Sequence, residues 1–364
     1  MQDDASSVSH AGQIPQGPFL LHAFPRLPCN FVQPPTTDHQ PTTSMLNIAV
    51  IGTGHLGSIH AKLWKEQEGA NLTAIVDPDE VKGRAVAEQH GVAWYPHLDA
   101  MPDVDAVVIA APTTYHHALA LRSLERGFHT FIEKPVTATY DEAVELLAKA
   151  SSLDLVVQVG HVERFNPAVR SLAPYKIEPL FIDGHRLATF KPRAIDVRVV
   201  QDLMIHDIDQ LLWMTASEVV DVQATGVAVL TETPDICNAR LTFANGCVAN
   251  LTASRISIKP MRKLRVFQRD SYLSLDLGEG SVEMFRLIDH NALEPEHQFP
   301  ITNVQTSHGD RMIVMDQPTV VATNAIFEEQ RSFIDSITSN TRAAVTLRDG
   351  AEAVRVAEQI ESLL

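Results

Sequence analysis

Three glycines, Gly52, Gly54 and Gly57, follow the apolar run Ile48 to Ile51 in the pattern G-x-G-x-x-G. Between a strand and a helix, the first glycine permits a tight turn and the second lets the backbone approach a pyrophosphate. The third lets the helix pack closely on the strand. Free N–H groups at the start of the helix then face the anion. The pattern predicts dinucleotide binding, although such glycines can also serve only to make a turn.

Asp77 ends a second apolar run, twenty residues after Gly57. A carboxylate at this position accepts hydrogen bonds from an adenosine ribose and repels a 2′-phosphate. The sequence therefore favours NAD over NADP.

A later stretch, VVQDLMIHDIDQLLWM, places Asp202, His206 and Asp209 at positions i, i+4 and i+7. This spacing stacks the three side chains on one face of a helix. A carboxylate four residues before a histidine can orient the imidazole and raise its basicity, which suits a general base for an alcohol proton. A solvated polar face, or a carboxylate–histidine pair that ties two domains together, would give the same pattern.

The sequence Glu133-Lys134-Pro135 follows the short run FHTFI (128–132). If that run is a central parallel strand, Lys134 lies at its carboxyl end, beside a nicotinamide bound over the glycine turn. It could there stabilise a developing alkoxide or carbonyl oxygen. A surface lysine is the alternative interpretation.

Strand and helix patterns alternate from residue 45 to about 165, which predicts a doubly wound parallel sheet covered on both faces. Ligands of such sheets bind beyond the carboxyl ends of the strands. The residues expected to contact the cofactor are Gly52, Thr53, Gly54, His55, Leu56, Gly57, Asp77, Thr113, His116, Glu133 and Lys134.

The pattern changes in residues 166–364. Long alternating runs at 180–190, 219–231, 238–258 and 263–279 predict an α+β domain with a mostly antiparallel open sheet. Asn245-Gly246 is a strong hairpin signal. One helix is expected at about 199–214, loop at 287–317, and helices at about 322–339 and 348–364.

Residues 1–44 carry seven of the 21 prolines and no periodicity, which predicts a disordered extension. Since Met45 directly precedes the first strand, we expect it to be the biological start. A functional tail is the alternative.

Composition excludes several classes of function. The net charge of −16, without a Lys/Arg run, disfavours nucleic acids and anionic membranes as partners. No apolar segment approaches the length of a membrane span. The three cysteines lack metal-type spacing, and the sixteen histidines are scattered without an HExxH pattern, so no metal site is expected. We interpret the protein as cytoplasmic.

Taken together, these residues resemble the Gfo/Idh/MocA family of oxidoreductases over about 45–364. The likeness is carried by the GTGHLG turn, Asp77, the segment APTTYHHALALRSLERGFHTFIEKP (111–135) and the Asp202-x-x-x-His206 pair. The resemblance implies that Lys134, Asp202 and His206 form the catalytic group of an NAD-dependent dehydrogenase.

Four further segments resemble one branch of this family: HVERFNPA (161–168), DLMIHDID (202–209), NARLTFANGCVANLTASR (238–255) and KPMRKLRVFQ (259–268). That branch oxidises the 3-hydroxyl of UDP-N-acetylglucosamine, so that a partner aminotransferase can install an amine for a lipid A sugar. On this resemblance His206 takes the hydroxyl proton, Asp202 orients His206, and Lys134 holds the reacting oxygen.

Arg164 and Asn166 are candidates for binding the nucleotide sugar, since a diphosphate needs cationic donors. Helix capping and surface charge would explain them equally well. The resemblance also implies a homo-dimer or tetramer formed through the open sheet. Two other functions stay open: an inositol or other sugar dehydrogenase, and a non-catalytic regulator that binds NAD.

Overall fold

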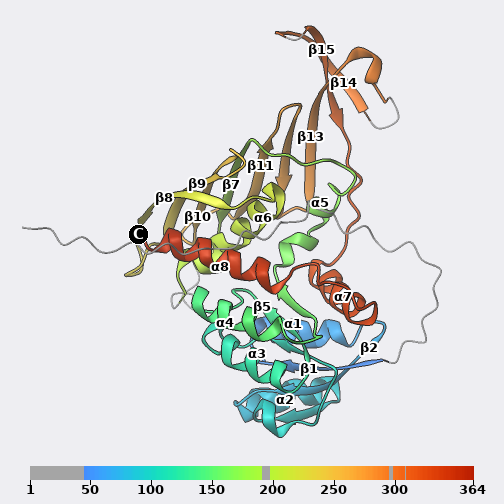
Figure 1. Cartoon of the computed structure of the whole chain (residues 1–364), viewed down its shortest axis with the longest axis vertical. Coiled ribbons are helices and arrows are strands. Elements are labelled where there is room, and N and C mark those ends of the chain that lie inside the picture. The colour runs from blue at the N-terminus through green and yellow to red at the C-terminus, as the bar shows by residue number, and fades with distance from the viewer. Residues whose placement is uncertain (1–44, 191–196, 295–297, 308) are drawn as a thin grey trace, which may run out of the picture.

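The computed structural model describes residues 45–190, 197–294, 298–307 and 309–364 as two domains, each built on one sheet (Figure 1). The predicted disorder of residues 1–44 lies outside the described residues. The first sheet ends at Gly160 and the second begins at Phe181. Among the described residues, no helix combines the length and apolar character needed to cross a bilayer.

The first domain is the predicted doubly wound fold. Its six strands are all parallel, in the order β3-β2-β1-β4-β5-β6. Their bounds are β1 (Leu46–Ile51), β2 (Ala70–Val76), β3 (Ala93–Tyr95), β4 (Ala106–Ile109), β5 (His129–Glu133) and β6 (Val157–Gly160). The connecting helices are α1 (His55–Trp64), α2 (Glu80–His90), α3 (His116–Glu125) and α4 (Tyr140–Ala150). Strand order reverses between β1 and β4, and ligands of such sheets bind at this switch point.

Alternate residues of β1 belong to two different hydrophobic cores. Ile48 and Val50 pack in one core with Trp64 of α1. Ala49 and Ile51 pack in the other, which continues into the second domain. Both faces of the strand are therefore buried, which explains its continuous apolar sequence.

The second domain contains one nine-stranded sheet, in the order β14-β15-β13-β12-β11-β7-β10-β9-β8. Every neighbouring pair is antiparallel except β7 and β10. The bounds are β7 (Phe181–Leu187), β8 (Val219–Val227), β9 (Ile236–Phe243), β10 (Val248–Ser254), β11 (Met261–Phe267), β12 (Ser271–Asp276), β13 (Ser281–Ile288), β14 (Gln298–Thr306) and β15 (Gly309–Asp316). The predicted Asn245-Gly246 hairpin joins β9 to β10, with Gly246 at φ 87°.

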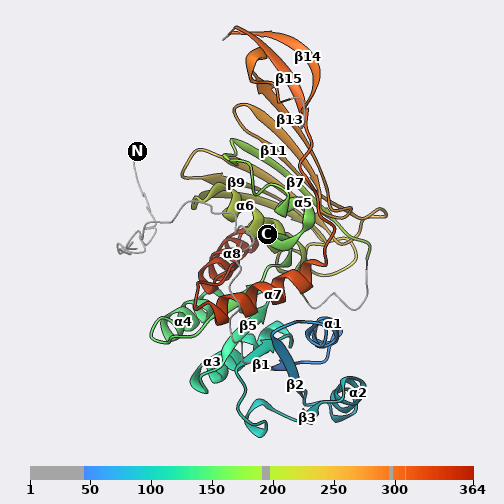
Figure 2. The same cartoon turned by 90° about the vertical axis from the view of Figure 1, so that its right-hand side faces the viewer.

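The prediction of loop for 287–317 was wrong, because β14 and β15 occupy most of it. These strands project from one end of the sheet, and most of their residues are exposed or only half-buried (Figures 1 and 2). A strand without a buried face needs no alternation of apolar and polar residues, so its sequence lacks the pattern used to predict strands.

Helices at the junction of the two sheets position the candidate site. The π-helical turn η5 (Val200–Met204) leads into α6 (Ile205–Thr215), and η3 (Val162–Phe165) with α5 (Pro167–Arg170) follows β6. The C-terminal helices are α7 (Ala325–Thr338) and α8 (Leu347–Glu361), drawn in red between the sheets in Figure 1. Helix α7 packs against α1, whereas α8 contacts α4 of the first domain and α6 of the second.

Candidate active site

The glycine turn between β1 and α1 is shaped by close approaches of the backbone. A Cβ atom on Gly57 would lie 2.0 Å from the carbonyl oxygen of Gly52, and Gly52 itself has a φ of 96°. A Cβ on Gly54 would meet no atom within 4 Å among the described residues. Gly54 is also the N-cap of α1, and no side chain caps this end. The first N–H groups of α1 thus face open space, which fits a pyrophosphate.

Asp77 lies directly beside this turn. Its Oδ2 atom accepts hydrogen bonds from the backbone N of Thr53 at 2.7 Å and from Thr53 Oγ1 at 2.6 Å. These bonds hold a half-buried carboxylate where the adenosine ribose lies in this type of fold. Of the other turn residues, His55 is exposed and Leu56 is half-buried.

Lys134 extends from the end of β5 towards η5. Its Nζ atom donates a hydrogen bond to the backbone oxygen of Asp202 at 2.8 Å and lies 3.7 Å from Asp202 Oδ1. Burial lowers the pKa of Lys134, and the carboxylates of Asp202 and Glu133 oppose this shift. The side chain is 13% exposed, so it can still reach a ligand.

The sequence predicts a contact between the Asp202 carboxylate and the His206 ring. No hydrogen bond joins these two side chains in the described structure. Asp202 lies in the π-helical turn, whereas His206 lies in the α-helix that follows. Because a π-turn is wider than an α-turn, positions i and i+4 no longer stack. Asp202 faces Lys134 instead, and Nδ1 of His206 is buried without a hydrogen-bond partner among the described residues.

His206 is nevertheless suited to act as a base. Burial lowers its pKa well below the ordinary value, and the charges of Lys134 and Arg186 add to this effect, followed by His161 and Arg262. The ring is therefore neutral at neutral pH and can accept a proton.

Buried hydrogen bonds connect the backbone of Lys134 to helices α1 and α7. The backbone N of Lys134 donates to Glu133 Oε2 at 3.1 Å, and Glu133 Oε1 lies 2.7 Å from Nε2 of His60 in α1. The other ring nitrogen of His60 lies 3.0 Å from the amide nitrogen of Gln330 in α7. Although burial favours the neutral acid, the His60 bond and charge lower the pKa of Glu133. Glu133 thus links the loop after β5 to helix α1.

His116 is positioned differently from the expected cofactor contact. It is buried, and its Nδ1 and Nε2 atoms lie 2.8 Å from the carbonyl oxygens of Pro135 and Ala111, respectively. Its ring therefore ties the loop after β4 to the loop after β5. Thr113, at the start of the first of these loops, is half-buried.

Arg164 and Asn166 both have partners inside the protein. Arg164 forms a two-pronged ion pair with Asp209, at 2.8 and 2.6 Å. The Asn166 side chain caps α5 by accepting from the backbone N of Ala168, and it donates to Glu163 and to the carbonyl of Leu277. The geometry favours the capping interpretation for Asn166 and an internal ion pair for Arg164.

A buried cluster of charged side chains around Arg186 of β7 was not predicted from the sequence. Arg186 donates to both carboxylate oxygens of Asp207 at 2.8 to 3.1 Å and to Glu163 at 2.9 Å. The two carboxylates raise the pKa of Arg186 against the effect of burial. A signal was present, because Arg186 falls in phase with the buried Ile182 of the same strand.

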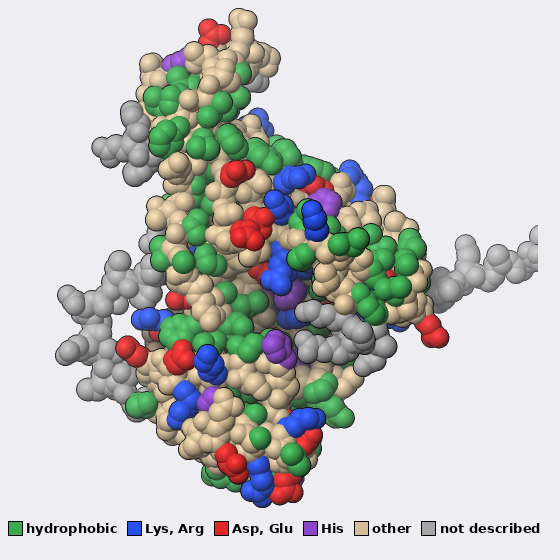
Figure 3. Space-filling view, turned by 180° about the vertical axis from the view of Figure 1, so that it is seen from behind, with side chains coloured by type: hydrophobic (Ala, Val, Ile, Leu, Met, Phe, Trp, Pro, Cys, Tyr) green, Lys and Arg blue, Asp and Glu red, His purple; other side chains and the backbone are tan. Residues whose placement is uncertain are grey.

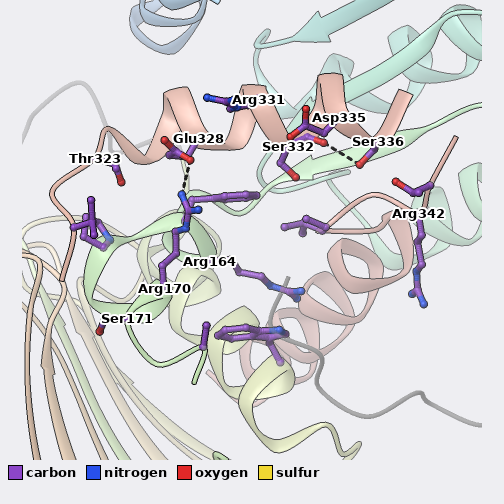
Figure 4. A pocket seen from close by; sticks show the side chains of 18 of the residues that line it. Arg164, Arg170, Ser171, Thr323, Glu328, Arg331, Ser332, Asp335, Ser336 and Arg342 are labelled. Atoms are coloured by element: carbon purple, nitrogen blue, oxygen red, sulfur yellow. Dashed lines mark hydrogen bonds and ion pairs between the residues drawn. The ribbon is translucent and has the colours of Figure 1, made fainter. Parts of the chain in front are cut away.

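A cavity of about 780 Å³ is lined by residues of η3, α5, α6 and α7. Figure 4 shows Arg170 of α5 bonded to Glu328 of α7, with Arg164 reaching into the same space. Neither Lys134 nor His206 lines this cavity. On the opposite face from Figure 1, basic and histidine side chains gather where the two domains meet (Figure 3).

Comparison with known proteins identifies the family. Residues 46–161 match the model described as "Oxidoreductase family, NAD-binding Rossmann fold", and residues 179–271 match the GFO/IDH/MocA C-terminal domain. The chain is 39% identical over 242 residues to UDP-N-acetylglucosamine 3-dehydrogenase of Acidithiobacillus ferrooxidans, covering 66% of this chain and 77% of that protein.

Two further matches agree with this result. A solved structure of the Acidithiobacillus ferrooxidans enzyme superimposes with a TM-score of 0.77 at 31% identity, covering 88% of this chain and 98% of the other. The scyllo-inositol 2-dehydrogenase (NAD(+)) of Bacillus subtilis is 30% identical over 233 residues, which are 57% of this chain and 67% of that protein.

The fold and the site define an NAD-dependent oxidoreductase that acts on a CH–OH group. The chain belongs to the Gfo/Idh/MocA oxidoreductase family.

Proposed function

We propose that the protein oxidises the 3-hydroxyl of UDP-N-acetylglucosamine to the 3-keto sugar, with NAD as the hydride acceptor. The observation that carries this proposal is the placement of Lys134 and His206 at one junction, beside the carboxyl ends of the parallel strands. The 39% identity to a UDP-N-acetylglucosamine 3-dehydrogenase supports the choice of substrate.

The residues divide the chemistry between them. NAD, when bound, supplies the oxidant that accepts the hydride from C3. His206, held neutral by its surroundings, takes the hydroxyl proton. Lys134 donates a hydrogen bond to the developing carbonyl oxygen. Asp202 acts by positioning Lys134, since its backbone oxygen and its carboxylate both lie near Nζ.

Arg262 replaces Arg164 as our candidate for the diphosphate of the substrate. It is an exposed residue of β11 that lies opposite Arg186 of β7, and the charges of both arginines lower the pKa of His206. Charge-assisted bonds to phosphate are strong, about 1.5 to 3 kcal/mol each.

Arg262→Ala tests this assignment, with Arg269→Ala as a matched control. Arg269 is also exposed but lies in the turn beyond the far end of β11. We expect Arg262→Ala to raise KM for UDP-N-acetylglucosamine about tenfold or more, and Arg269→Ala to leave it unchanged. Equal KM values in both variants would contradict a diphosphate contact at Arg262.

The open face of the second sheet supports self-association. Aromatic side chains from neighbouring strands contact one another across it: Phe181 with Phe267 at 5.8 Å, Phe267 with Tyr272 at 4.9 Å, and Tyr272 with Phe285 at 6.2 Å between centroids. Phe267 is 40% exposed. The other three aromatic residues are half-buried. Apolar surface that is left partly exposed in this way is typical of interfaces, and we propose that two copies pack here in a homo-dimer or tetramer.

A role in lipid A biosynthesis follows from the proposed product. A 3-keto sugar is a substrate for transamination, so an aminotransferase is the expected functional partner. The proposed location is the cytoplasm, which suits Cys237 and Cys247, both of which are buried free thiols.

An inositol dehydrogenase is the second candidate, because the Bacillus subtilis relative carries that activity in its name. Arg262 separates the two functions: inositol has no phosphate, so Arg262→Ala should leave the KM of myo-inositol unchanged. A non-catalytic NAD-binding regulator is disfavoured by the buried support that Glu133 and His60 give to Lys134, which a regulator does not need.

A further inference from the structure

Several buried polar atoms, one of them on His206, have no hydrogen-bond partner in the described part of the chain. They are Nδ1 of His206, both ring nitrogens of His161, both carboxyl oxygens of Glu329 and Oε1 of Gln158. Their residues come from α6, from the segment after β6, from α7 and from β6 itself. Buried polar groups are normally hydrogen-bonded, so a group of them in one region needs an explanation.

These side chains are neighbours. The Nε2 atom of His161 lies 4.0 Å from Oδ1 of Asp209, and the amide of Gln158 donates to the backbone oxygen of Glu329 at 2.9 Å. The charge of Asp209 also acts on Glu329, and that of His161 acts on His206. A polar region therefore extends from His206 through His161 to Asp209, in addition to the buried cluster around Arg186.

The far end of this region reaches the cavity shown in Figure 4. Asp209 is paired with Arg164, and Arg164 lines that cavity together with Trp213, which lies one helical turn beyond Asp209. Arg331 of α7 also lines the cavity and is exposed, so the cavity meets solvent.

The proposed reaction releases a proton, which must leave the site. Oxidation of an alcohol by NAD yields a ketone, NADH and one proton, and this proton is first held by His206. At that moment bound substrate and cofactor would block release of the proton on the side of the ring from which it came. Nδ1 is itself one of the buried unpartnered atoms, and ordered water joining such atoms is common in proteins.

We propose that His161 and Asp209 form a proton exit, which conducts the proton from Nδ1 of His206 through internal water to the cavity lined by Arg164 and Trp213. This inference rests on the proposed function. The O–H bond of the substrate breaks and an N–H bond forms on His206. His206 is then returned to its neutral form as His161 receives a proton and passes it towards Asp209. Glu329, as a neutral acid beside Asp209, can join the same chain of donors and acceptors.

Charged residues on neighbouring elements shift the pKa values of His161 and His206. Burial lowers the pKa of His161, which Asp209 and Asp349 oppose and Arg164 and Lys134 reinforce. His206 is faced by Lys134, Arg186, His161 and Arg262. A proton on either ring is therefore transient, as conduction requires.

Stopped-flow single turnover tests the exit, with NADH absorbance and a pH-indicator dye recorded together. Any sugar or cyclitol that the wild type oxidises serves as substrate. In the wild type, proton release should follow NADH formation without delay. In His161→Leu, we expect release to lag, kcat to fall about tenfold or more with KM retained, and the solvent deuterium isotope effect to increase.

His161→Gln is the second variant, because it keeps polarity and hydrogen bonding but cannot carry a proton. It should behave like His161→Leu. Recovery of wild-type kcat and prompt proton release in His161→Gln would show that His161 only fills space, which overturns the exit while leaving the proposed function intact. A wild type that forms no NADH with any substrate would overturn both proposals.

Discussion

The glycine turn that forms the nucleotide cradle and the proposed catalytic region around Lys134 and His206 are built by different means. The cradle is a short segment, in which the backbone around Gly52 and Gly57 leaves no room for a Cβ atom. The proposed catalytic region joins polar and charged side chains that are far apart in sequence, such as Lys134 with Asp202 and His60 with Glu133. Steric exclusion therefore fixes the first, and buried electrostatics fixes the second. The two regions should respond differently to mutation and to pH.

Removing the catalytic charge should have the largest effect. Lys134→Ala is expected to lower kcat about 100- to 1000-fold, because the donor to the developing carbonyl oxygen is lost. Affinity for NADH, measured by fluorescence titration, should be retained, since the cradle is intact. Lys65→Ala removes an exposed lysine at the end of α1 and should change neither quantity. Full turnover in Lys134→Ala with NAD bound would refute the catalytic assignment.

Two glycine variants separate steric exclusion from ligand contact. Gly57→Ala forces a methyl group against the Gly52 carbonyl and should destabilise the fold by about 1 to 3 kcal/mol. Gly54→Ala meets open space, so it should keep wild-type stability yet weaken NADH binding where the pyrophosphate approaches. Thermal unfolding and NADH titration measure both effects. If the two variants lost stability equally, the steric account of the cradle would be wrong.

The pH profile should report the electrostatics of the catalytic region. Because burial and the charge of Lys134 hold the pKa of His206 well below 6.5, kcat/KM should stay level on acidification through pH 6.5 and fall only at lower pH. Arg262→Gln removes one of the repelling charges, so the acidic limb should move to higher pH. A wild-type limb centred above pH 6.5 would show that His206 is not the base, or is not buried in solution.

A smaller effect on stability is expected at Glu329. Burial raises its pKa well above 4.5, and the charges of Glu133 and Asp209 add to this shift. The folded protein therefore holds this proton more tightly than the unfolded chain, and the resulting stabilisation is lost as pH rises above about 4.5. Urea titrations should show a shallower decline in the free energy of unfolding with rising pH for Glu329→Gln than for wild type. Identical slopes would indicate that Glu329 ionises normally in the folded state.

The same contrast explains what the sequence could predict. The order of strands and helices in the first domain, the glycine turn and Asp77 were predictable because each depends on a local pattern. The π-helical turn could not be predicted, because Asp202 and His206 have the ordinary spacing of an α-helix and the wider turn is a property of the folded backbone.

Side-chain partners were the least predictable feature. Nothing near Arg164 in the sequence indicates that Asp209, 45 residues later, neutralises it. The strands β14 and β15 were missed for a different reason, since exposed strands lack an apolar face. Local sequence patterns thus predicted most of the helices and strands. The pairing of buried charged residues could be seen only in the folded structure.

The most direct test of the account is NADH absorbance after mixing the purified protein with NAD and UDP-N-acetylglucosamine. UDP-glucose, UDP-N-acetylgalactosamine and myo-inositol run in parallel, and a second set contains glutamate and an aminotransferase that consumes the keto sugar. We predict NADH with UDP-N-acetylglucosamine and none with myo-inositol. NADH with myo-inositol alone would contradict the proposed substrate, and silence in every well despite bound NAD would contradict a catalytic role altogether.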